Sequence, residues 1–207
     1  MSSTSLFLTT TDGITLEALA TPPADPPRGG ALILHPHPLY GGDLHNHVVT
    51  ALAREAAARG MLALRLNFRG VGRSTGRHDG GRAEVADALA GLAWLREQGV
   101  GPLVLMGYSF GALVAAQTAL QAGDLAAGFW VSPAVVLETP PPWPGPGPLH
   151  ILSGTLDEFA PPRALAAYAD GCPACHLELV EGLDHFWQGS GATLAAWLDQ
   201  LPRALGA

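Results

Sequence analysis

The chain has 207 residues, of which 48% are hydrophobic and 14% charged, enough apolar material for one sizeable core and a single domain over residues 1–207. The formal net charge is −7 and the chain contains no lysine, so it has no basic stripe to bind nucleic acid or an anionic membrane. No run reaches the roughly 18 apolar residues of a membrane span, and residues 1–11 do not form a signal peptide. We expect a soluble, cytoplasmic protein.

The first predicted elements form an antiparallel hairpin, with alternating strands at Leu6–Thr10 and Ile14–Ala20 and a tight turn at Asp12-Gly13. After a proline-rich segment, apolar strands alternate with helical stretches. In chain order they are strand 31–35, helix 45–59, strand 62–66, helix 83–97, strand 103–106, helix 112–121, strands 127–131 and 150–153, helix 162–169, strand 176–180 and helix 192–201. This alternation predicts an α/β fold with a mainly parallel sheet covered on both faces.

The pentapeptide Gly107-Tyr108-Ser109-Phe110-Gly111 has the pattern G-x-S-x-G and lies between a predicted strand and a predicted helix. In that context the pattern indicates a nucleophile elbow, in which a tight turn lifts the serine Oγ above the sheet. The two glycines give steric room for the turn and for close packing of the helix. Ser109 is therefore the candidate nucleophile.

A serine nucleophile needs a histidine to accept its proton and an acid to orient that histidine. Asp157 and His185 each follow a predicted strand, and the order Ser109, Asp157, His185 is the order of α/β-hydrolases. Three other acids are alternatives to Asp157. Asp184 is adjacent to His185, Asp170 lies near a helix end, and Glu158 points away from wherever Asp157 points.

The segment 35–42, HPHPLYGG, follows the first parallel strand, where serine hydrolases of this layout provide one oxyanion-hole N–H group. The other donor is the residue after the nucleophile, Phe110. Proline has no N–H, so the loop donor must be His37, Leu39 or Tyr40, and we favour Leu39.

No metal or cofactor is expected. His45 and His47 are two residues apart on a predicted helix and face different ways, whereas helical metal ligands lie at i and i+4. Cys172 and Cys175 form a C-x-x-C pair that precedes a strand, which suits incidental thiols better than a redox site. The glycine-rich segment 67–74 lacks a phosphate-binding lysine. Glu84 and Asp87 are expected to pair with Arg69 or Arg73.

The connection from Ser132 to Pro148 carries six prolines in its second half, which exclude a helix and favour a stiff extended path. No lid domain can be built from it. We therefore predict an open site with Tyr40, Tyr108 and Trp143 as aromatic residues at its rim.

The segments HPHPLYGGDLHNHVV, NFRGVGRSTG, GYSFGA, GTLDEFAPP and GLDHFW together resemble small bacterial α/β-hydrolases with an HPHP loop, close to the dienelactone hydrolase and serine aminopeptidase branches. The resemblance runs from about Ala31 to Trp187 and implies an eight-stranded α/β-hydrolase sheet with Ser109, Asp157 and His185 as the triad. It implies no cofactor and no particular substrate. A carboxylic ester or related small acyl compound is the expected substrate; a thioesterase, an aminopeptidase-like hydrolase and a catalytically idle scaffold are the alternatives.

Overall fold

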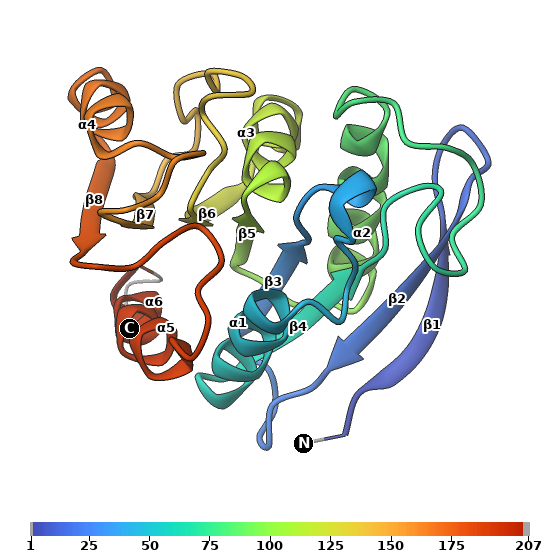
Figure 1. The fold of residues 1–207 in the computed structure, drawn as a ribbon. Helices are drawn as coiled ribbons and strands as arrows, with labels where there is room; N and C mark the ends of the chain where they lie inside the picture. The colour runs from blue at the N-terminus through green and yellow to red at the C-terminus, as the bar shows by residue number, and fades with distance from the viewer. Residues whose placement is uncertain (1, 205–207) are drawn as a thin grey trace.

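The computed structural model describes residues 2–204 and contains one eight-stranded sheet (Figure 1). The predicted domain 1–207 thus includes residues 1 and 205–207, which lie outside the described part. The strands are β1 (Thr4–Thr9), β2 (Thr15–Thr21), β3 (Gly29–Leu34), β4 (Met61–Leu66), β5 (Leu103–Tyr108), β6 (Leu125–Val131), β7 (Leu149–Gly154) and β8 (Cys175–Val180). Their order is β1-β2-β4-β3-β5-β6-β7-β8, and only the pairings of β2 with β1 and β4 are antiparallel.

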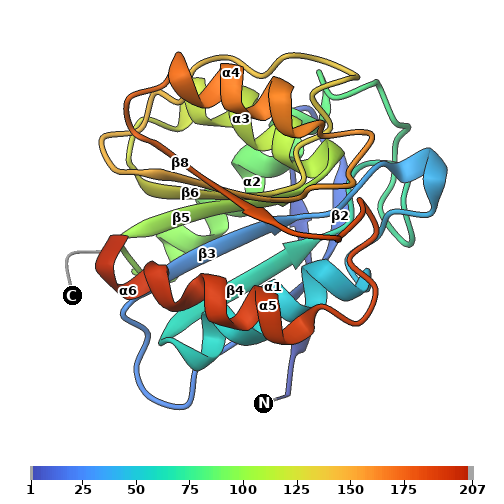
Figure 2. The same cartoon turned by 60° about the vertical axis from the view of Figure 1, so that its left-hand side comes forward.

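Helices cover both faces of this sheet, as the alternating sequence pattern predicts (Figure 2). One face carries α2 (Glu84–Glu97), α3 (Phe110–Ala122) and α4 (Pro162–Asp170). The other carries α1 (His47–Ala58), α5 (Gly191–Trp197) and α6 (Leu201–Ala204). The predicted final helix 192–201 is divided in two by a 3-10 turn at Leu198–Gln200. Pro202 accounts for the break, because it has no N–H to donate to a carbonyl one turn earlier.

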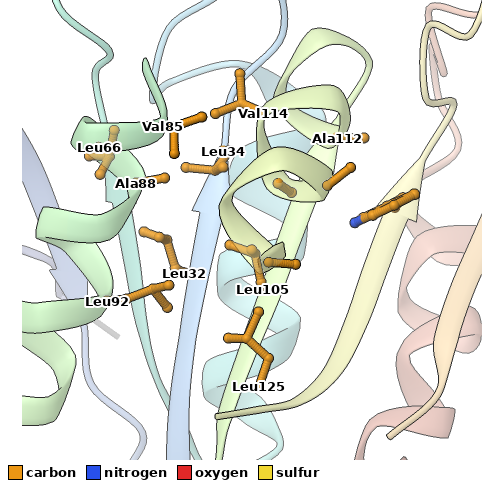
Figure 3. Close-up of a cluster of buried hydrophobic side chains, with 14 of the residues drawn as sticks. Leu32, Leu34, Leu66, Val85, Ala88, Leu92, Leu105, Ala112, Val114 and Leu125 are labelled. Carbon is orange, nitrogen blue, oxygen red and sulfur yellow. The ribbon is translucent and has the colours of Figure 1, made fainter. Parts of the chain in front are cut away.

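The core consists of two apolar clusters, one on each face of the sheet. In the cluster of Figure 3, Leu32 and Leu34 of β3 and Leu105 of β5 point toward α2 and α3. The strand β3 is buried at every position, which explains why its sequence is an unbroken apolar run rather than an alternating one. This buried central part of the sheet fixes the ends of β3 and β5, from which the candidate site is built.

The connection between β6 and β7 forms no helix or strand, and no lid is present among the described residues. Trp143 lies within it but is only 7% exposed, and its ring packs edge-on against Trp130 at 6.1 Å between centroids. Its indole N–H donates to the Gly147 carbonyl. The prediction that Trp143 lies at the rim of the site is therefore wrong, because this ring anchors the connection to the core.

The first hairpin turns at Asp12-Gly13, as predicted. The Thr10 N–H donates to the Ile14 carbonyl across the turn, and Gly13 supplies the positive φ, of 82°. A hydrogen bond from the Thr10 hydroxyl to Asp12 stabilises the turn. Among the described residues, none of the helices combines the length and the apolar character that crossing a bilayer requires.

His150 on β7 is buried between the rings of Phe129 and His176, and its Nδ1 has no hydrogen-bond partner. Burial and the neighbouring His176 lower the pKa of His150 to about 4. The unfolded chain takes up this proton below about pH 6.5, whereas the folded chain resists until about pH 4. The folded state is therefore destabilised relative to the unfolded chain as the pH falls between these values, because only the unfolded chain gains the proton.

We predict that His150→Phe stabilises the fold. The phenyl ring keeps the stacking on Phe129 and removes an unsatisfied buried nitrogen, worth about 1–3 kcal/mol. The gain should be larger at pH 5 than at pH 8, because only the histidine requires the folded state to exclude a proton. Thermal unfolding at both pH values measures it, with the exposed His45→Gln as control. A gain that is equal at the two pH values would contradict the prediction.

Candidate active site

Ser109 occupies a strained turn between β5 and α3. Its φ of 56° lies in the left-handed region, which non-glycine residues rarely adopt. A Cβ at Gly107 would lie 2.5 Å from the Gly111 carbonyl oxygen, and a Cβ at Gly111 would lie 2.4 Å from that of Leu34. Neither position can hold a side chain. The two glycines of the pentapeptide are thus required by close approach of the backbone, and the predicted elbow geometry is present.

The three residues predicted to form the triad lie in one hydrogen-bonded row. His185 Nε2 is 2.8 Å from Ser109 Oγ, and His185 Nδ1 is 2.9 and 3.0 Å from the two carboxylate oxygens of Asp157. All three side chains are buried. Because the Asp157 carboxylate accepts a hydrogen bond from the Nδ1–H group, Nε2 carries no proton and can accept the proton of the serine hydroxyl.

Asp157 is fixed in place by its own loop. Its Oδ1 accepts from the backbone N–H groups of Phe159 and Ala160, and its Oδ2 accepts from the buried Ser153 hydroxyl. Burial alone would raise the pKa of Asp157, but its hydrogen bonds, chiefly that from His185, outweigh burial and lower the pKa. The carboxylate is therefore ionised at neutral pH.

The alternative acids are engaged elsewhere. Asp184 Oδ1 accepts from the N–H of Phe186 within its own loop, Glu158 is exposed, and Asp170 is the last residue of α4. Among the acids considered in the sequence, the structure thus brings Asp157 alone to the Nδ1 of His185.

Three side chains hold the loop that carries His185. The Tyr108 hydroxyl donates to the His185 carbonyl at 2.7 Å, and His47 Nε2 donates to the next carbonyl, that of Phe186. Trp187 has a positive φ of 55°, and its indole N–H donates to Ser132 Oγ at 2.8 Å. His47, considered above as a metal ligand, is therefore a loop anchor in this structure.

The HPHP segment connects the end of β3 to α1 and contains a 3-10 turn, Pro38–Tyr40. His35 ties this loop to the end of β4. Its Nδ1 donates to the Pro36 carbonyl, and its Nε2 accepts from the N–H of Phe68. Burial lowers the pKa of His35 to about 4, so the ring is neutral and keeps this pattern. A Cβ at Gly42 would lie 2.0 Å from the Pro36 oxygen, so the loop must close tightly.

Leu39 does not suit the role of oxyanion donor that the sequence suggested. Its N–H already donates to His37 Nδ1, and its side chain is 73% exposed and lies outside the cavity that contains Ser109. The Tyr40 N–H donates to the His37 carbonyl. The N–H groups of His37 and Phe110 have no hydrogen-bond partner within the described part of the chain. The favoured loop donor is therefore corrected from Leu39 to His37, which the proline argument had left open.

Glu84 also differs from its prediction. Its fully buried carboxylate binds His78 Nδ1 and the N–H groups of Asp79 and Gly81 instead of an arginine. The His78 ring in turn packs edge-on against His37 at 5.0 Å. Asp87 does pair with Arg69, as predicted, at 2.8 Å. Glu84 thus organises the loop that supports the oxyanion segment.

Ser109 opens into a cavity of about 360 Å³, which we call the site cavity. Tyr40, 85% exposed, stands at its mouth as predicted, whereas Tyr108 is buried and forms part of its wall. Sequence reasoning missed Phe159 and Phe186, which line the same cavity. Their positions in the sequence, two residues after Asp157 and one after His185, were the available signal.

Within the described residues no group of three metal-ligand side chains gathers.

Comparison with known proteins defines the class first. The structure superimposes on an alpha-beta serine hydrolase homologue from Coxiella burnetii with a TM-score of 0.88 and 31% identity, over 97% of this chain and 98% of that one. It also matches a serine hydrolase without a lid from Xanthomonas campestris, with a TM-score of 0.92 and 28% identity, over 100% of this chain and 97% of that one. The protein is an α/β serine hydrolase.

The family follows from sequence. The model of the serine aminopeptidase S33 family matches residues 37–166, and the chain belongs to that family. An uncharacterised protein of Rickettsia prowazekii is 41% identical over 107 residues, which make up 51% of this chain and 45% of that protein. The match thus spans less than half the length of that curated relative.

The oxyanion assignment can be tested by replacing His37, whose φ of −58° is one that proline adopts. His37→Ala removes the ring and keeps the N–H, whereas His37→Pro removes both. We expect kcat of His37→Pro to fall about 10²–10³-fold below that of His37→Ala, the usual loss for one oxyanion donor. Equal kcat values for the two variants would show that the His37 N–H is not used.

Proposed function

We propose that the protein hydrolyses a carboxylic ester through an acyl-enzyme formed on Ser109. The observation that carries this proposal is the row of hydrogen bonds from Ser109 Oγ through His185 to the buried carboxylate of Asp157. Serine is a weak nucleophile until a base removes its proton, and this arrangement supplies the base and holds it in the required tautomer.

In the proposed first step, Ser109 Oγ attacks the carbonyl carbon while its proton passes to His185 Nε2. The N–H groups of Phe110 and His37 stabilise the negative charge on the carbonyl oxygen. His185 then returns the proton to the departing alcohol oxygen, and the carbon–oxygen bond breaks to leave Ser109 acylated. In the second half of the reaction, a water molecule gives a proton to His185 and attacks the acyl carbon. The bond to Ser109 Oγ then breaks, the acid is released, and the proton returns from His185 to Ser109.

The same row of groups would also serve a thioester or a peptide with a free N-terminus, the alternatives raised by the sequence. A peptide requires a partner for its terminal ammonium group. The residues that line the site cavity include no aspartate or glutamate, and this favours the ester over the aminopeptidase alternative.

The nucleophile is tested with a fluorophosphonate probe, which needs both an activated hydroxyl and an oxyanion hole. Wild-type protein should be labelled and Ser109→Ala should not. Ser190→Ala is a control, because that serine is buried at the start of α5 and its hydroxyl contacts none of the three residues of the row. Equal labelling of wild type and Ser109→Ala would remove Ser109 as nucleophile, and labelling of neither would favour the idle scaffold.

The acid is tested by Asp157→Asn, which preserves size and removes the charge that fixes the histidine tautomer. We expect kcat to fall by about 10⁴-fold, as in the best-studied triad, with little change in the melting temperature. Asp170→Asn, at the end of α4, is the matched control and should retain wild-type activity. A near-normal rate in Asp157→Asn would show that another acid orients the histidine.

A further inference from the structure

Large apolar side chains that remain exposed gather around the site cavity. Four of them, Tyr40, Leu137, Phe159 and Phe186, line it directly, with exposures of 85, 55, 41 and 55%. Exposed apolar side chains on a soluble protein are usually scattered singly, and a contiguous group marks a binding surface. Water is a poor partner for these surfaces, so a ligand that covers them gains binding energy.

The cavity contains no fixed charge. None of its lining residues is an aspartate, glutamate or arginine. The side-chain oxygen of Asn46, which also lines the cavity, accepts hydrogen bonds from the N–H groups of Val48 and Val49 at the start of α1. The Tyr108 hydroxyl is bound to the His185 carbonyl. A carboxylate or ammonium group would lose its hydration here without a charged partner, which is costly. The part of the substrate that enters the cavity is therefore uncharged.

Two aromatic rings pack against the ring of His185, the residue proposed above to transfer the proton. The Phe159 ring lies 4.7 Å from that of His185, and the Phe186 ring lies 5.8 Å away at 87°. His185 must protonate the departing oxygen, so the alcohol part of an ester lies beside His185 and these two rings. The acyl part points away from His185. Aromatic groups prefer edge-to-face and offset contacts with other rings at such distances.

We infer that the preferred substrate, given the ester hydrolysis proposed above, is an uncharged ester whose alcohol part carries an aromatic ring seated between Phe159 and Phe186. The cavity of about 360 Å³ lies at the small end of ligand pockets, which suits one ring on a short linker rather than a long chain. Both phenylalanines are positioned by the triad loops, because Phe159 N–H donates to Asp157 and Phe186 follows His185.

The test compares two pairs of esters by kcat/KM in a pH-stat. Benzyl acetate and cyclohexylmethyl acetate place an aromatic or a saturated ring on the alcohol side. Ethyl phenylacetate and ethyl cyclohexylacetate place the same rings on the acyl side. We expect kcat/KM for benzyl acetate to be about tenfold higher than for cyclohexylmethyl acetate, because the aromatic ring gains two aromatic–aromatic contacts. The kcat/KM values of the acyl-side pair should differ little. The charged 4-carboxybenzyl acetate should be hydrolysed more slowly than benzyl acetate.

Variants assign the preference to the rings. Phe159→Leu and Phe186→Leu should each lower the benzyl-to-cyclohexylmethyl ratio of kcat/KM by several-fold without loss of fold, because both side chains are exposed and lie outside the apolar core. Phe7→Leu is the matched control: Phe7 is 51% exposed on β1, does not line the cavity, and its replacement should leave the ratio unchanged.

Three results would overturn the inference while leaving ester hydrolysis in place. These are a ratio near one on the alcohol side, a preference confined to the acyl-side pair, and faster turnover of the charged ester. Failure to hydrolyse any of these esters, together with absence of fluorophosphonate labelling, would instead overturn the proposed function and the inference with it.

Discussion

The close approach of α3 to the ends of β3 and β5 is the constraint on which the site depends. Gly111 lies so near the Leu34 and His35 carbonyls that no side chain fits, and Gly107 lies equally near α3. This contact pushes Ser109 into a left-handed conformation at the tip of the turn. It also sets the start of α3 beside the HPHP loop, since the rings of Phe110 and His37 are 4.8 Å apart. Ser109 and the HPHP segment are thus placed by one packing contact.

Strain is concentrated around the same row of groups. Among the described residues, the non-glycine residues with positive φ are Ser109, Ser132 and Trp187. Such conformations cost about 1–3 kcal/mol each and persist only where surrounding contacts enforce them. The indole N–H of Trp187 can only donate, so Ser132 Oγ accepts from it and turns its own hydroxyl toward Ser153, which donates to Asp157. The strained loop after His185 is in this way joined to the carboxylate that orients His185.

Sequence patterns were sufficient to predict the sheet and the grouping of Ser109, Asp157 and His185, because both depend on local patterns. Strand and helix periodicity predicts the alternation, and Ser109, Asp157 and His185 each follow a strand whose end is visible in the sequence. The oxyanion loop is different. Whether His37 or Leu39 offers a free N–H depends on a 3-10 turn and on a ring nitrogen two residues away, details of a few ångströms that proline spacing alone does not determine.

Trp143 and Glu84 show a second limit of prediction from sequence. A tryptophan in a proline-rich segment and a glutamate near arginines are both typical of exposed positions, and only the tertiary structure shows the space that they occupy. Gly128 supplies that space for Trp143, because a Cβ there would lie 2.9 Å from its ring. Glu84 is buried because the loop 78–81 folds back and provides N–H donors that no local pattern indicates.

The buried position of Trp143 also explains why the mouth of the site is open. The tryptophan and the bond from the Tyr168 hydroxyl to the Pro141 carbonyl draw the second half of the connection between β6 and β7 onto the α3–α4 face. That segment therefore leaves Phe159, Phe186 and Tyr40 uncovered. The open mouth and the absence of charged side chains among the cavity's lining residues favour the same kind of ligand, the small uncharged substrate inferred above.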